Sequence, residues 1–127
     1  MTMHLLTQQT LRFIKAFGYS LEGLKAAFVS EPAFVIEIIC SLLLLPIACL
    51  LPLPLVSKAL LISSLILVLI VELINSAIEA TIDRISSERH PLAKKAKDIG
   101  SAAVLLSLIN AAAVWGMILW PVVSSLI

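Results

Sequence analysis

The chain has 127 residues, of which 61% are hydrophobic and 13% charged, with a net charge of +1 and a mean hydropathy of +1.11. This excess of apolar residues argues against a soluble helical bundle, and the near-neutral charge gives no sign of nucleic-acid binding. Cys40 and Cys49 lie in an apolar segment without a CxxC motif. We therefore expect them to pack as small residues and to form neither a disulfide nor a zinc site. The polar start of the sequence predicts no cleaved signal peptide.

Residues 5–30 are predicted to form an amphipathic helix. Arg12 and Lys15 lie on its other faces, and this combination is typical of a helix in the membrane interface. An ordinary surface helix packed on the rest of the fold would show the same pattern. Its apolar stripe, at steps of three and four residues, consists of Ile14, Phe17, Leu21, Leu24 and Phe28.

Three apolar segments follow, at about 33–51, 56–80 and 100–122. Each has close to the 20 or so residues needed to cross a bilayer, and each should be helical because lipid cannot satisfy open backbone groups. Pro32 is tolerated in a first helical turn and is expected to start the first span, which Pro46 is expected to kink.

Basic residues predict the orientation in the membrane. Lys58 is alone between the first two spans, whereas the connection expected at 83–98 is strongly basic. The positive-inside rule places that connection and the N-terminus in the cytoplasm and the C-terminus outside, with Trp115 and Trp120 as belt residues at the outer interface. The basic residues of the connection are Arg84, Arg89, Lys94, Lys95 and Lys97.

The segment VELINSAIEATIDR, residues 71–84, places polar side chains at the end of the second span. Glu72, Asn75, Glu79 and Asp83 are spaced i, i+3, i+7 and i+11, which puts them on one face of a helix. Acids at membrane depth are costly and usually functional. The opposite face stays apolar, with Ile70, Leu73, Ile74, Ala77 and Ile78.

Two interpretations of this polar row remain open. The acids could pair with basic residues and hold helices together, or they could bind a divalent metal and its phosphates, since Mg²⁺ commonly uses one or two carboxylates plus phosphate oxygens. Glu31 lies at a depth similar to that of Glu79 and could supply a second carboxylate. In the basic connection and at the start of the third span, the residues that could hold a phosphate, a metal or a water are His90, Lys97, Asp98 and Ser101.

Three stretches resemble the bacterial integral-membrane diacylglycerol kinase family, which includes a branch that phosphorylates undecaprenol. They are GYSLEGLKAAF at 18–28, VELINSAIEATIDR at 71–84 and KAKDIGSAAV at 95–104. The resemblance implies a single all-α membrane domain over 1–127, with an interfacial helix and three transmembrane helices. It also implies a homotrimer in the bacterial inner membrane, whose shared sites transfer the γ-phosphate of MgATP to the lipid hydroxyl.

The resemblance also implies roles for individual residues. Glu72 would be the general base and Asn75 would assist it, while Glu31 and Glu79 would hold Mg²⁺. Phe17, Pro32, Pro91 and Lys94 depart from the family pattern close to these positions. Nucleotide contacts would come from Arg12, Tyr19, Glu31, Glu79, His90, Lys97 and Asp98, and lipid contacts from Arg12, Glu72 and Ser101.

Three other functions are compatible with an acidic row in a membrane helix. Undecaprenol kinase would use the same chemistry on another lipid. A small cation-coupled transporter would also carry intramembrane carboxylates. A structural or assembly subunit would consume no ATP. Of these functions, phosphorylation of diacylglycerol to phosphatidic acid is the prediction favoured by the residues and the resemblance.

Overall fold

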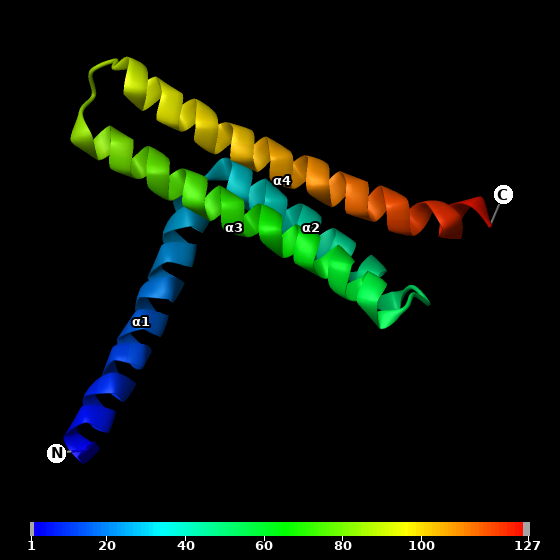
Figure 1. The fold of residues 1–127 in the computed structure, drawn as a ribbon, viewed down its shortest axis with the longest axis horizontal. Helices are drawn as coiled ribbons and strands as arrows, with labels where there is room; N and C mark the ends of the chain where they lie inside the picture. The colour runs from blue at the N-terminus through cyan, green and yellow to red at the C-terminus, as the bar shows by residue number, and fades with distance from the viewer. Residues whose placement is uncertain (1, 126–127) are drawn as a thin grey trace. The chain divides into compact units, whose positions relative to one another are not determined.

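A computed structural model describes residues 2–125, with side chains from residue 8 onward, and forms four helices over that range. The helices are α1 (Thr2–Ser30), α2 (Pro32–Leu50), α3 (Leu55–Ile85) and α4 (Pro91–Ser124) (Figure 1). Within the described residues there is no strand, so the predicted all-α class is confirmed. The chain divides into two units, residues 1–32 and residues 33–127.

The first unit consists of α1, a helix of 29 residues that includes both Gly18 and Gly23 without a break. Large apolar side chains such as Phe13, Phe17 and Phe28 are exposed along it. Exposed aromatic residues beside Arg12 suit a helix that lies in the membrane interface, as the sequence predicts.

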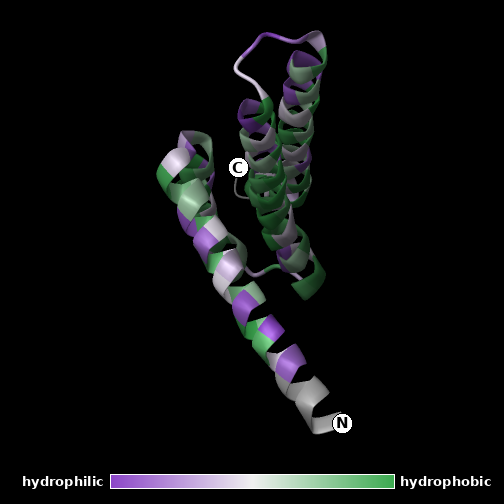
Figure 2. Cartoon of the chain, turned by 90° about the vertical axis from the view of Figure 1, so that its left-hand side faces the viewer, coloured by the Kyte–Doolittle hydropathy of each residue, from purple (hydrophilic) through white to green (hydrophobic). Residues whose placement is uncertain are grey.

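The second unit contains three helices that are long and apolar enough to cross a membrane, with 19, 31 and 34 residues. At 1.5 Å per residue, α3 and α4 are about 46–51 Å long, which exceeds the roughly 30 Å of the hydrocarbon core. Both helices therefore extend beyond the lipid tails. Hydrophilic residues gather around the loop that joins α3 to α4, whereas hydrophobic residues dominate the middle of both helices (Figure 2).

The connection between α3 and α4 is much shorter than the expected 83–98, because only residues 86–90 lie outside the helices. Pro91 occupies the first turn of α4, where a missing N–H is harmless, and the Nδ1 atom of His90 accepts a hydrogen bond from the backbone N–H of Leu92 at 3.1 Å. His90 therefore caps the helix and lets the basic segment be helical. Pro32 likewise starts α2, as predicted.

The helices α3 and α4 run side by side in opposite directions (Figure 1). We call the end with residues 86–90 the loop end, and the end with residues 51–54, which join α2 to α3, the turn end. Toward the turn end, a hydrophobic cluster joins all three helices and consists of Ala48, Leu61, Leu65 and Trp115.

Trp115 is buried in this cluster, so its assignment to an interfacial belt is wrong. A belt residue faces lipid headgroups, whereas the indole of Trp115 packs between helices. Trp120 is 73% exposed, and its belt role stays a prediction.

At the turn end, α2 continues through Pro46 to Leu50. The Nζ atom of Lys58 donates a hydrogen bond to the carbonyl oxygen of Cys49 at 2.6 Å. Carbonyls in a last helical turn have no partner within the helix, so this lysine closes the end of α2.

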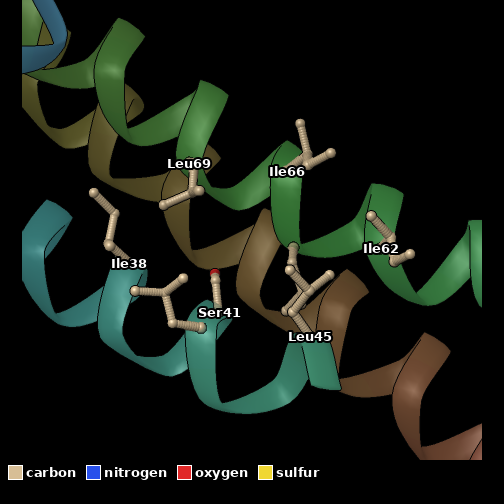
Figure 3. A pocket seen from close by; sticks show the side chains of 8 residues that line it. Ile38, Ser41, Leu45, Ile62, Ile66 and Leu69 are labelled. Carbon is tan, nitrogen blue, oxygen red and sulfur yellow. The ribbon is translucent and has the colours of Figure 1, made fainter. Parts of the chain in front are cut away.

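A groove of about 250 Å³ lies between α2 and α3 in the apolar part of the unit. Figure 3 shows its walls, where Ile38 and Leu45 of α2 face Ile62, Ile66 and Leu69 of α3. Apart from the hydroxyl of Ser41, all its lining side chains are apolar. Such walls offer no charged group for phosphate chemistry, so a site for that chemistry has to lie elsewhere.

Candidate functional site

The polar row of α3 becomes more exposed toward the loop end. Glu72 is only 5% exposed, Asn75 and Glu79 are half-buried, and Asp83 is exposed. Asn75 meets α4 at Gly100 and Asp83 meets it at Lys97, so these two residues of the row face α4. The hydrogen bond from Asn75 to Glu79 shows that Glu79 lies on the same side of the helix as Asn75. The opposite face is exposed at Ile70, Ile74 and Ile78.

Asn75 and Glu79 are joined along the row. The Nδ2 atom of Asn75 donates a hydrogen bond to Oε1 of Glu79 at 3.2 Å. This bond fixes one oxygen of the carboxylate and leaves its other lone pairs available for a cation or a donor.

Two ion pairs lie at the loop end. The Nζ atom of Lys97 donates to Oδ1 of Asp83 at 2.6 Å, and Lys94 pairs with Asp98 one turn further along α4. Lys97 precedes the apolar part of α4, so this pair joins α3 to α4 at the loop end. Asp83 thus pairs with a basic residue, which is the helix-joining role that the sequence left open.

A hollow of about 690 Å³ lies at the loop end, within the size range of small-molecule sites. Both ion pairs line it, and Arg89 and His90 add a cation and an imidazole. Charged side chains thus line this hollow, in contrast to the apolar groove between α2 and α3. His90, Lys97 and Asp98, which were predicted to contact a nucleotide, all border it, whereas Ser101 is exposed on the next turn of α4.

The other predicted site residues, Arg12, Tyr19 and Glu31, belong to the first unit. Arg12 and Tyr19 are exposed on α1. Glu31 follows the last turn of α1, where its Oε1 atom accepts a hydrogen bond from the hydroxyl of Ser30 at 3.1 Å. Glu31 is therefore the single residue between α1, which ends at Ser30, and α2, which starts at Pro32.

The comparison with known proteins connects these features to a family. Residues 18–119 match the family described as prokaryotic diacylglycerol kinase. The chain belongs to this family. A diacylglycerol kinase of Escherichia coli is 53% identical over 109 residues, covering 86% of this chain and 89% of the relative. A diacylglycerol kinase of Pseudomonas aeruginosa is 50% identical (85% and 88% covered), and one of Haemophilus influenzae is 45% identical (84% and 91% covered).

Two residues that lie next to the polar row in this member of the prokaryotic diacylglycerol kinase family were not predicted as site residues. Glu37 on α2 lies close enough to Glu72 for their carboxyl groups to interact electrostatically. Gly100 on α4 is buried against Asn75. An acid inside an apolar span was a usable signal for Glu37, and a glycine within a helix was a weaker one for Gly100.

The residues present are compatible with the Mg²⁺ that the family resemblance implies. Glu79 offers a carboxylate that Asn75 orients, and Mg²⁺ takes such oxygen ligands while phosphates supply others. Among the described side chains, no group of three or more His, Cys, Asp or Glu residues converges on one point. The metal site therefore stays a prediction, in which the substrate supplies part of the ligand shell.

Proposed function

We propose that the protein phosphorylates diacylglycerol to phosphatidic acid, taking the γ-phosphate of ATP. Its membership of the prokaryotic diacylglycerol kinase family supports this activity, and the names of the relatives favour diacylglycerol over undecaprenol as the acceptor. The observation that carries the mechanism is the polar row of α3, which runs from a buried carboxylate to a hollow lined by charged side chains, Lys97 among them.

Glu72 is the general base of the proposed reaction. Its carboxylate accepts the proton of the lipid hydroxyl while that oxygen forms a bond to the γ-phosphorus. The bond to the oxygen that bridges the β- and γ-phosphates breaks at the same time, and ADP leaves. Burial supports this role because a carboxylate shielded from water is reserved for the lipid hydroxyl, and water is excluded as a competing acceptor.

The polar groups nearer the loop end bind the nucleotide in this proposal. Glu79, oriented by Asn75, would hold Mg²⁺ together with Glu31, and the metal would neutralise phosphate charge when bound. Lys97 supplies a second positive charge, and Asp98, His90, Arg12 and Tyr19 complete the nucleotide contacts. Arg12 and Ser101 contact the lipid beside Glu72.

The proposed location is the bacterial inner membrane, with the loop end and the N-terminus in the cytoplasm, where ATP is available. The cluster of basic residues at the loop end supports this orientation. We further propose a homotrimer with sites shared between subunits. Glu72 is buried within the single chain, but Asn75 and Glu79 are only half-buried, and a second subunit would shield them from lipid.

The test is ATP turnover by the purified protein in mixed micelles with Mg²⁺. Parallel samples contain a short-chain diacylglycerol, an undecaprenol analogue or no acceptor. We expect phosphatidic acid to form in clear excess over the polyprenyl product.

The reverse preference would keep the mechanism and move the protein to the undecaprenol branch. A folded sample without lipid-dependent turnover would contradict the kinase function. Uptake driven by a pH gradient into sealed vesicles, without ATP, would then favour a cation-coupled transporter.

A further inference from the structure

Gly100 differs from the other glycines of the chain in what surrounds it. It is buried on α4, and a Cβ atom built on it would overlap Oδ1 of Asn75 on α3. A Cβ atom on Gly18, Gly23 or Gly116 would meet no atom within 4 Å. A side chain at position 100 would therefore displace the amide of Asn75, whereas a side chain at the other glycines would meet open space.

The amide of Asn75 is held between this glycine and Glu79. Its Oδ1 atom is buried against Gly100 and has no hydrogen-bond partner among the described residues, while its Nδ2 atom donates to Glu79. A buried carbonyl oxygen without a conventional donor is unusual. A weak contact from the Cα–H group of glycine suits such a position, because no side chain keeps the oxygen away.

We propose that Gly100 is a positioning residue for phosphoryl transfer, acting through Asn75 on Glu79. The inference rests on the proposed kinase function. The bare Cα of Gly100 leaves room for the Asn75 oxygen, and this fixes the direction in which the amide nitrogen points. That direction presents the amide to Oε1 of Glu79 and so sets the orientation of the carboxylate that is proposed to hold Mg²⁺.

The effect of a side chain at position 100 follows from which atom would have to move. The overlapping atom is the tip of a flexible side chain and does not belong to the backbone. In the Gly100→Ala variant the amide of Asn75 therefore rotates away from the added methyl group at little expense to the fold. The hydrogen bond from Asn75 to Glu79 is then lost. The helices stay packed while the proposed metal ligand loses its orientation.

The experiment compares Gly100→Ala with Gly116→Ala, a matched substitution on the same helix with open space around it. For Gly100→Ala we expect kcat to fall about 10-fold or more and the Mg²⁺ concentration for half-maximal activity to rise about 10-fold, with the KM for lipid within twofold of wild type. Gly116→Ala should stay within twofold of wild type in all three quantities. A merely structural role would lower thermal stability without shifting the Mg²⁺ requirement.

The double variant Gly100→Ala with Asn75→Ala tests whether the effect passes through Asn75. Its thermal stability should be no lower than that of Asn75→Ala alone, because the overlap is gone and alanine favours a helix over glycine. If Gly100→Ala does not fold, the double variant still should, and failure of both would overturn the proposal. Wild-type turnover with unchanged kinetics in Gly100→Ala would also overturn it, whereas an inactive wild type would contradict the kinase function itself.

Discussion

The two ends of the α3–α4 pair differ in the side chains that join the helices. Toward the turn end, Leu61 and Leu65 pack against Trp115, and all three side chains are buried. At the loop end the same helices meet through Gly100 against Asn75 and through Lys97 with Asp83. Apolar packing holds one end and needs no particular chemistry, whereas the other end keeps polar groups near the membrane surface. This difference indicates that stability and activity can be altered separately.

The largest effect should come from Glu72→Gln. The amide cannot accept the proton of the lipid hydroxyl, so kcat should fall about 10²–10⁴-fold while the protein stays folded. Turnover in mixed micelles and thermal unfolding of the same sample measure both quantities. Glu22→Gln, which changes an exposed acid of α1, is the control and should leave turnover unchanged. Near-normal activity in Glu72→Gln would remove the base assignment.

Leu61→Ala should show the opposite behaviour. Leu61 is fully buried, and its truncation leaves a cavity between helices that should lower the free energy of unfolding by about 2–4 kcal/mol. Unfolding in detergent measures this loss, and Leu60→Ala, at an exposed neighbouring position, should change it by less than about 1 kcal/mol. At temperatures where Leu61→Ala is folded, kcat should match wild type. A kcat that falls with stability would mean that the two ends are coupled.

Lys97→Met and Asp83→Asn separate a nucleotide contact from a surface ion pair. A charged contact to a phosphate is worth about 1.5–3 kcal/mol, so Lys97→Met should raise the KM for ATP about 10-fold or more. Asp83→Asn removes only an exposed pair and should change stability by less than about 1 kcal/mol. If both substitutions changed the KM for ATP equally and only slightly, Lys97 would not contact the nucleotide. Its role would then be limited to the ion pair with Asp83 that joins the two helices.

The smallest effect concerns His90. His90→Ala removes the cap of α4 and should lower stability by about 0.5–1 kcal/mol, whereas His90→Asn keeps an acceptor at that position and should be nearly neutral. Thermal unfolding of the two variants measures the cap. A raised KM for ATP in His90→Asn, with stability unchanged, would show that the imidazole also contacts the nucleotide, and an unchanged KM would limit it to capping.

Periodicity and composition were enough to predict the helical class, the three apolar helices and the common face of the polar row. These features depend on spacing along one helix, and helix geometry converts spacing into direction. The limits of the helices at the loop end were not predicted correctly. The run of basic residues after Pro91 was predicted to belong to the connection between helices. In the structure, Pro91 and the His90 cap start α4 there.

The sequence by itself determined that acids would lie in a membrane helix beside a cationic segment, because residue identity and order settle hydropathy and charge. Only the tertiary structure decided which groups meet across helices. Lys97 pairs with Asp83, Trp115 lies in the core, and Gly100 faces Asn75. The physical reason is that the register and rotation of α3 against α4 follow from the summed packing of many side chains, which the spacing within either helix does not contain.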